Sequence, residues 1–550
     1  MQIRLTIFAF YDILYLRYNP QITARSNLAL FYYRGLIMAR DYDKITKEIT
    51  LVGFFSEYLP PCFKLNKSVL FNTPPENCDL IPPLCFSMSR FNATNGRRNI
   101  FIPEIGSYLV SYNYIRSNGI IKELITFCDK SDVSFSNILG PDNSIMTHEQ
   151  SYNNDYSPVR SEDDSPSFYI QNICKKLIKA SGANKILKLD ISNCFSSFYV
   201  HMVPAILLGY EKTNEEYKKS LSNGSSVTID PTYLKYRKLD DILRKQNLNR
   251  TNGLLVGTLY SKIILEGILC RIDQELLAEG IKFSRYVDDY EVYIFDDQED
   301  KVISSFDRIL KRYGFALNSE KIEIVDYPFY VTENLQKLFK DFSSTKLDTP
   351  ALMKLFNTFL TMEKQGTKGA IRFLLKSIEC SPIETDEKDL YKSYLLSILS
   401  NDKRSLVKAC SLLIGMGTNK LNDADSALLS TQTKQFLANN YDLEVVWLVY
   451  LLIKCQKLKK SDELIELICN SDNELAQTIL LRSNMLYKKN LSILKEKAQS
   501  WLLLYELFAA DIISKEEFCD KANVKHNLDI YEKFKTRDLH FCSFDVSITL

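Results

Sequence analysis

One short stretch, residues 283–295 (FSRYVDDYEVYIF), constrains the fold more than any other part of the chain. Aromatic and β-branched residues flank Asp288 and Asp289 on both sides, and this pattern predicts a strand, a tight turn and a second strand. Adjacent carboxylates repel each other, so a cation beside the turn would stabilise it. Mg²⁺ is the natural ion, because it takes carboxylate oxygens together with substrate phosphates. The alternative is an ordinary solvated turn, in which Asp is common.

A third acid lies well upstream. The alternating apolar residues of 185–190 predict a strand that ends in Asp190, and residues 195–203 look helical. Asp190 can meet Asp288 only if the two strands are neighbours in one sheet. Two-metal phosphoryl transfer requires such convergence, with ions about 3.5–4 Å apart. The alternative is that Asp190 caps the helix that follows it.

Three weaker signals accompany the acids. Residues 252–266 predict a glycine loop that runs into a helix, and both features favour anions or close ligand approach. Lys321 follows the hairpin closely enough to reach a phosphate. Arg97 and Arg98 lead into a predicted strand, and guanidinium groups match phosphate geometry. Taken singly, each also fits an ordinary role, as a turn glycine or a solvated cation.

In their order along the chain (Arg97 and Arg98, Asp190, the glycine loop, the hairpin of Asp288 and Asp289, then Lys321), the five features resemble the core of the reverse transcriptases over roughly residues 90–330. The resemblance implies two Mg²⁺ ions, with Mn²⁺ as an alternative, bound by catalytic Asp190, Asp288 and Asp289. It also implies nucleotide-binding roles for six residues. Phe195 would be the gate that excludes a ribose 2′-OH, and Gly257 and Ser261 would belong to the glycine loop. Lys321 would lie near the leaving pyrophosphate, and Arg97 and Arg98 would hold the triphosphate. The usual Pro-Gln before the glycine is Leu255-Val256 here, which puts contacts to a template in doubt.

The likeness narrows to the abortive-infection polymerases of the AbiK type. It rests on 189–193 with His201 and Pro204, on 284–289, and on two later segments, 367–372 and 498–518. Such proteins are bacterial anti-phage defence factors in the cytoplasm. The resemblance implies template-independent DNA synthesis from dNTPs, primed by a tyrosine of the enzyme, with the single-stranded product covalently attached. It also implies a closed homo-oligomer, a trimer or a hexamer.

The priming residue is hard to find among 32 tyrosines. Tyr42 precedes the segment 54–59 at about the spacing of the resembled family, so we predict that Tyr42 primes synthesis. The alternative is that Tyr42 is an ordinary surface tyrosine.

Composition bounds these expectations. A 550-residue chain with 25% charged residues and a net charge of +1 is typical of a globular protein that does not grip a long duplex. Its 13 cysteines form no Cys-x-x-Cys pair and its 4 histidines are scattered, so we expect reduced thiols and no zinc site. No apolar run approaches about 20 residues, so we expect no membrane span.

The predicted fold is α+β, with reverse-transcriptase-like fingers and palm over residues 1–335, an antiparallel sheet with packed helices, interrupted by a polar loop at 140–166. Residues 336–550 show helical periodicity with little glycine, which predicts an all-α domain. The resemblance makes that domain a HEAT-like helical repeat in place of a thumb. Within it we expect Asp442 to cap a helix and Ser514 with Glu517 to form a capping box.

Three functions fit the sequence. The first is a nucleotidyltransferase that performs protein-primed, template-independent DNA synthesis. The second is a templated reverse transcriptase. The third is an inert, polymerase-derived scaffold that acts through its helical domain, which the presence of all three acids disfavours.

Overall fold

The computed structural model describes residues 40–70, 79–90, 96–136, 138–140, 143–146, 168–222, 228–296, 298–330, 335–343 and 345–544. The chain divides into two compact units, residues 1–45 and 46–550. Helix α3 (Tyr42–Val52) begins in the first. Most of the predicted polar loop at 140–166 lies outside the described residues, and the predicted boundary at 335/336 stays a prediction.

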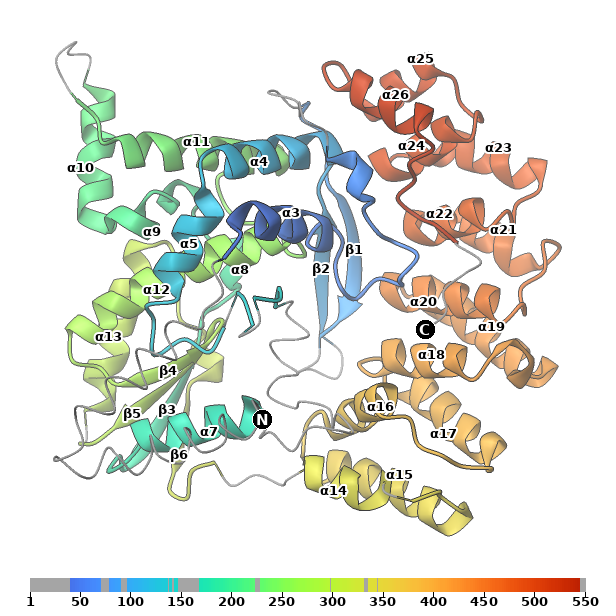
Figure 1. The fold of residues 1–550 in the computed structure, drawn as a ribbon, viewed down its shortest axis with the longest axis horizontal. Coiled ribbons are helices and arrows are strands. Elements are labelled where there is room, and N and C mark those ends of the chain that lie inside the picture. The colour runs from blue at the N-terminus through green and yellow to red at the C-terminus, as the bar shows by residue number, and fades with distance from the viewer. Residues whose placement is uncertain are drawn as a thin grey trace, which may run out of the picture. The chain divides into compact units, whose positions relative to one another are not determined.

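The strands of the described residues form two antiparallel sheets within a mixed α+β fold (Figure 1). The larger sheet has the order β4-β5-β3-β6. Its strands are β3 (Lys185–Asp190), β4 (Phe283–Tyr286), β5 (Asp289–Ile294) and β6 (Glu323–Asp326). Strands β4 and β5 are the predicted hairpin, and β3 is the predicted strand before it.

Helices cover both faces of this sheet. On one face, Ile186 and Tyr293 pack against Ala180, which follows α7. On the other, Phe283 and Tyr290 pack against Phe306 of α13. The alternation of inward and outward side chains along a strand therefore places two apolar layers around the sheet. The helices of this part are α4 (Ile105–Ser117), α5 (Ile120–Cys128), α7 (Phe168–Lys179), α8 (Cys194–Ser197), α9 (Ala205–Leu208), α10 (Tyr210–Leu221), α11 (Pro231–Gln246), α12 (Leu259–Ala278) and α13 (Glu299–Arg312).

The smaller sheet is the hairpin of β1 (Leu84–Ser89) and β2 (Arg97–Ile102). The free edge of β2 contacts the loop before α12, where Phe101 N donates to Val256 O at 2.8 Å. This hydrogen bond ties the hairpin to the glycine loop.

Between 195 and 203 the structure departs from the expected helix. It has the short helix α8 and the 3-10 turn Val200–Met202. Phe198 and Tyr199 interrupt them with extended backbone.

Beyond β6 the described chain is helical, as its periodicity predicts, and it runs from yellow to red in Figure 1. Helices α16, α18, α20, α22 and α24 each pack on the next, and so do α19, α21 and α23. Contacts between alternate helices are typical of stacked helical pairs. The series is α14 (Leu335–Ser343), α15 (Thr349–Lys364), α16 (Ala370–Cys380), α17 (Lys388–Asn401), α18 (Leu406–Gly415), α19 (Asp423–Ala438), α20 (Asp442–Lys454), α21 (Glu463–Asn470), α22 (Glu474–Arg482), α23 (Lys488–Lys497), α24 (Trp501–Ala509), α25 (Lys515–Ala522) and α26 (Leu528–Thr536).

Two predicted caps in this series have different outcomes. Ser514 is the N-cap of α25, and its hydroxyl accepts a hydrogen bond from Glu517 N, which is one of the two hydrogen bonds of the predicted capping box. Asp442 is not a cap, because α20 begins at Asp442 itself and Tyr441 holds the cap position. The Asp442 carboxylate instead accepts a hydrogen bond from Ser87 N at 2.8 Å, across to strand β1.

The helical series and the first part of the chain share buried contacts. The Trp447 indole donates to Tyr58 O at 2.7 Å, and the Tyr531 hydroxyl donates to the buried Glu104 carboxylate at 2.5 Å. Residues after α26 then contact the segment that follows α3, since Ser543 N donates to Cys62 O. Phe541 completes an aromatic cluster with Phe54, Phe55 and Trp501.

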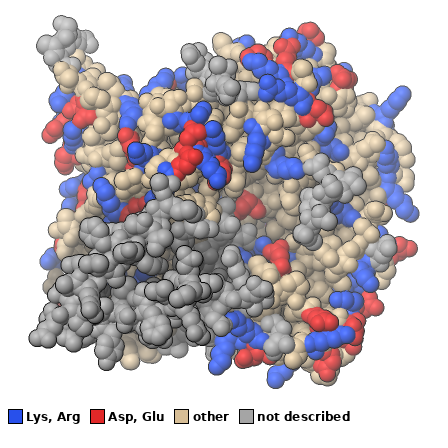
Figure 2. Space-filling view, viewed as in Figure 1, with Lys and Arg blue, Asp and Glu red and all other residues tan. Residues whose placement is uncertain are grey.

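Side chains of both charge signs are mixed on the visible face of the helical series. On the face shown in Figure 2, Lys and Arg side chains lie among Asp and Glu side chains over the helical series. None of the helices in the described ranges is both long enough and apolar enough to cross a membrane.

Candidate active site

The sheet brings the three predicted acids to one edge. Asp190, the last residue of β3, stands directly opposite Asp289, the first residue of β5. The backbone of Ile191 donates to the carbonyl oxygen of Asp288 at 3.2 Å. Strands β3 and β5 are therefore neighbours, which is the condition that the sequence argument set for convergence of the acids.

A buried arginine holds the turn that carries Asp288. Val287 has a φ of 53°, a left-handed conformation that is rare for a β-branched residue. Arg285 Nη1 donates to Val287 O at 3.0 Å, and Val287 N donates to Ser136 Oγ at 2.7 Å. These hydrogen bonds fix the strained backbone, and strain of this kind is concentrated at functional sites.

Arg285 is itself fully buried and paired with two acids of α12. Its Nη2 lies 2.9 Å from Glu266 Oε1 and 2.7 Å from Asp273 Oδ2. Burial disfavours the charge, but the two carboxylates outweigh it and hold the pKa of Arg285 well above its ordinary value. The α12 helix thus positions the turn through an ionic network that motif matching did not reveal.

Asp190 has polar partners from the segment after α13. Lys321 Nζ lies 2.7 Å from Asp190 Oδ1, and Asn318 Nδ2 donates to Asp190 Oδ2 at 3.1 Å. Asn318 N also donates to Asp190 O at 2.8 Å. The predicted Lys321 is therefore at the acids, and Asn318 is a site residue that sequence reasoning missed.

Burial and neighbouring negative charges raise the pKa values of Asp288 and Asp289. Burial, followed by the charges of Asp288 and Asp190, raises the pKa of Asp289 to about 7. Burial and Asp190 also raise the pKa of Asp288, while the charges of Arg98 and Lys321 oppose that shift. A group of carboxylates destabilised by one another favours a positive charge beside it.

The donor chemistry fits a hard divalent cation, because carboxylate oxygens are the ligands that Mg²⁺ prefers. In this arrangement Lys321 supplies the positive charge at Asp190. Among the described residues, no three His, Cys, Asp or Glu side chains stand close enough to enclose a metal ion. Metal binding at Asp190 would therefore require the exposed Lys321 side chain to move.

A cavity of about 740 Å³ opens in front of the acids. Its lining includes Asp190 and Asp288, the predicted gate Phe195, and the cations Arg98 and Lys321. The cavity thus joins carboxylates to basic groups, which is the combination needed to bind a nucleoside triphosphate through a cation.

The two predicted arginines have different roles. Arg98 is exposed, lines the cavity and has no ion-pair partner in the described part of the chain. Arg97 also borders the cavity, but its guanidinium forms a two-pronged pair with Glu444 of α20, at 3.0 and 2.9 Å. It also stacks over Tyr441, 4.2 Å from the ring centroid. In this arrangement Arg98 can meet a phosphate, whereas Arg97 anchors the hairpin.

Within the glycine loop, Gly257 packs against strand β2 and does not line the cavity of the acids. Gly257 has a φ of +126°, and a Cβ there would lie 2.8 Å from Ile100 Cγ2 and 2.9 Å from Phe101 O. The glycine is needed because strand β2 passes so close. Ser261 is buried in the first turn of α12, where its N–H donates to the cap residue Thr258 and its side chain stays outside the cavity lining.

Tyr42 is the first residue of α3 and belongs to the unit of residues 1–45. Its priming role stays a prediction.

Comparisons with known proteins give weak structural likeness alone. No protein-family model matches the sequence, and no curated protein matches it. Among solved structures, the chain is similar to apo telomerase from Candida tropicalis, with a TM-score of 0.31, 13% identity and coverage of 69% of each chain. Telomerase from Candida albicans in complex with a fragment of telomeric RNA gives a TM-score of 0.27 at 15% identity, covering 64% of this chain. This chain spans 62% of that telomerase, which is less than two thirds of its length. Scores of this size establish neither a family nor a function.

Proposed function

We propose that the chain is a nucleotidyltransferase that polymerises deoxynucleotides without a template, starting from a tyrosine hydroxyl of its own chain. The observation that carries the proposal is the position of Asp190 opposite Asp289, with Asp288 in the adjoining turn, at the wall of a cavity that also holds Arg98 and Lys321. Asp190 and Asp288 line this cavity together with Arg98 and Lys321, and Asp289 lies directly opposite Asp190 in the sheet. Carboxylates and cations gathered in this way suit the transfer of a phosphoryl group.

Each side chain then has a task. Asp190, Asp288 and Asp289 would hold two Mg²⁺ ions, which lower the pKa of the attacking hydroxyl and neutralise the phosphates when bound. Arg98 and Lys321 bind the triphosphate, and Phe195 lies against the sugar. The acceptor oxygen forms a bond to the α-phosphorus, the bond to the β-phosphate oxygen breaks, pyrophosphate leaves and the hydroxyl proton passes to water.

The wider assignment follows the sequence resemblance. Residues 1–335 would be the fingers and palm, and 336–550 a HEAT-like repeat in place of a thumb. Tyr42 would supply the first hydroxyl, so the single-stranded product stays attached to the protein. The enzyme would act as a trimer or hexamer in anti-phage defence in the bacterial cytoplasm. The stacked pairs from α15 to α24 support the repeat.

The test uses the purified full chain with Mg²⁺ and each dNTP, without nucleic acid. We expect a protein-linked ladder after denaturation that nuclease removes. Asp288→Asn should abolish it, and Tyr42→Phe should remove the attachment. Extension of an annealed primer alone would indicate a templated reverse transcriptase. No incorporation under either condition would leave an inert scaffold and refute the proposal.

A further inference from the structure

The β1–β2 hairpin brings a third arginine to the cavity of the acids. Arg90 directly follows β1, is exposed and lines the cavity together with Arg98. Arg97, the other arginine of the hairpin, is committed to Glu444 and to the ring of Tyr441. Arg90 is thus a cation of the cavity that neither the sequence resemblance nor the proposed function uses.

The register of the hairpin determines the face on which Arg90 lies. Met88 pairs with Arg98 across the two strands. Arg90 N donates to Gly96 O at 2.8 Å, so the same register continues one residue past β1. Because side chains alternate between the two faces of a strand, Arg90 lies on the face of Arg98, whereas Arg97 lies on the opposite face.

The side chain of Arg90 crosses to the free edge of β2. Antiparallel residue pairs alternate between those that exchange hydrogen bonds and those that do not. Since Gly96 O accepts from Arg90, the carbonyl oxygen of the next residue, Arg97, is directed away from β1. Phe101 has the same parity along β2, and its N–H leaves the hairpin to bond Val256 O. Arg90 Nε donates to Arg97 O at 3.0 Å, so the guanidinium stands at the edge of β2 that borders the cavity.

The Arg90 guanidinium keeps its capacity to bind an anion. Of the five N–H donors of an arginine side chain, the one on Nε is used here. Among the described residues, no carboxylate pairs with Arg90 and no acceptor bonds its two terminal amino groups. Two parallel terminal donors match two oxygens of one phosphate group.

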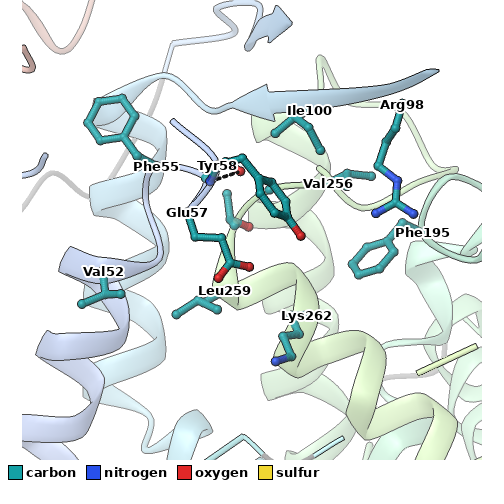
Figure 3. Close-up of a pocket in the computed structure, with 13 residues that line it drawn as sticks. Val52, Phe55, Glu57, Tyr58, Arg98, Ile100, Phe195, Val256, Leu259 and Lys262 are labelled. Atoms are coloured by element: carbon teal, nitrogen blue, oxygen red, sulfur yellow. Dashed lines mark hydrogen bonds between the residues drawn. The ribbon is translucent and has the colours of Figure 1, made fainter. Parts of the chain in front are cut away.

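Arg98 and Arg90 follow one another along the hairpin. The charge of Arg98 lowers the pKa of Asp288, so Arg98 lies near the acids. Figure 3 shows its side chain reaching from β2 toward Phe195. Arg90 lies nearer the tip of the hairpin, diagonal to Arg98, and such diagonal neighbours are about 7–8 Å apart. Two long side chains at that separation can bind neighbouring phosphates of one polyphosphate chain.

We propose that Arg90 binds the γ-phosphate of the incoming nucleotide and thereby selects triphosphates over diphosphates. The inference rests on the proposed function. With the α-phosphate at the acids, Arg98 meets the middle of the polyphosphate chain and Arg90 meets its end. A diphosphate leaves the Arg90 fork without its ligand and forfeits charge-assisted hydrogen bonds. Arg90 therefore takes the second position in the triphosphate grip that the sequence resemblance gave to Arg97.

The test measures equilibrium binding, so that it does not depend on priming. Full-length protein with Mg²⁺ is titrated by calorimetry with the α,β-methylene diphosphate and triphosphate of deoxycytidine, which differ only in the γ-phosphate. We expect the wild type to bind the triphosphate about tenfold or more tightly, as hydrogen bonds to a charged group allow. Arg90→Gln should weaken triphosphate binding about tenfold and change diphosphate binding by less than about threefold. Arg90→Lys should keep part of the preference, because it keeps the charge and loses the fork.

Arg250→Gln is the matched control, because it removes the same charge from an exposed residue that does not line the cavity. It should bind both analogues as the wild type does, and a loss as large as that of Arg90→Gln would overturn the inference. Equal binding of the two analogues by the wild type overturns it as well, whether or not the variants fold. So does a folded Arg90→Gln variant that weakens both analogues equally or weakens neither.

Failure of the parent proposal would be distinguishable. A protein in which Arg90→Gln removes the preference for the triphosphate, but which incorporates no dNTP, keeps the γ-phosphate site and loses the polymerase. A protein that incorporates dNTPs but binds diphosphate and triphosphate equally keeps the polymerase and loses the γ-phosphate site. Binding of neither analogue overturns both.

Discussion

Val287 carries its strained backbone conformation because Arg285 and Ser136 hold it from both sides. Such strain costs on the order of 1–3 kcal/mol, and the surrounding contacts must supply that free energy. The result is a turn that presents Asp288 and Asp289 in a fixed direction. Rigidity of this kind suits catalysis, since a small misplacement of reacting groups reduces the rate strongly.

Replacing the buried guanidinium of Arg285 should lower the free energy of unfolding. Arg285→Met leaves Glu266 and Asp273 as unpaired buried charges, and we expect a loss of about 3–5 kcal/mol in the free energy of unfolding. Denaturant titration measures it. The combined change with Glu266→Gln and Asp273→Asn should recover much of the loss. If the free energy of unfolding of Arg285→Met lies within about 1 kcal/mol of the wild-type value, the ionic network does not stabilise the fold as argued.

The raised pKa of Asp289 predicts a dependence of stability on pH. An aspartate in the unfolded chain has a pKa of about 3.9, so between that value and the folded pKa of about 7 the folded state binds a proton that the unfolded state lacks. Without divalent ions, the melting temperature should therefore fall as pH rises toward 7.

Asp289→Asn should flatten this slope, and Mg²⁺ should raise the melting temperature more at pH about 8 than at pH about 5, since the cation binds the ionised acid. Scanning calorimetry with and without Mg²⁺ checks both. A slope of the same size in Asp289→Asn would assign the effect to another group.

At the residue scale, the sequence located the acids because Asp-Asp between two strand patterns is a local signal. It did not reveal Arg285, Asn318 or Ser136 as supports, because their partners lie on other elements. Nor did it separate the roles of Arg97 and Arg98, which alternate sides of one strand. That distinction depends on α20, more than three hundred positions later in the chain.

At the scale of elements, the β1–β2 hairpin is attached to α20 by a compact set of polar contacts. Arg97 pairs with Glu444, whose side chain is only 2% exposed. Ser89 Oγ donates to the same carboxylate at 2.7 Å, and Ser87 N donates to Asp442 at 2.8 Å. The hairpin that presents Arg98 to the cavity is thus anchored on the helical series.

The two halves of this pair should respond unequally to mutation. Arg97→Met leaves a buried carboxylate without its main partner, so we expect a loss of about 2–4 kcal/mol in unfolding free energy. Glu444→Gln leaves a partly exposed guanidinium that water can solvate, so it should cost less. A double-mutant cycle by denaturant unfolding measures the coupling, and additive effects would show that the pair does not interact.

Elements with strong periodicity were predictable from the chain. The hairpin of β4 and β5, strand β3 and the long α12 lie where their patterns predict. The segment after Asp190 was predicted less well, because packing of Phe198 and Tyr199 against neighbouring segments overrides local helical preference. Asp442 shows the same effect of tertiary contacts. Its carboxylate accepts a hydrogen bond from Ser87 N of strand β1 and does not cap α20.

At the scale of the whole molecule, the helical series and the sheet-containing part share one buried aromatic cluster. We expect residues 336–550 expressed alone to expose Trp501 and Phe541 and to lose cooperative unfolding. Coexpression with residues 1–335 should restore a complex that elutes together in size-exclusion chromatography. A sharp thermal transition from the isolated fragment would show that the series folds independently.

The return of residues 541–543 to residues 62–64 has a consequence for biosynthesis. Phe541 packs on Phe54 and Phe55, but the ribosome makes it about 490 residues after them. At about 5–20 residues per second, the interval is on the order of a minute. Throughout that interval the nascent chain carries an unfilled aromatic surface, which makes it a natural client for chaperones that shield such patches.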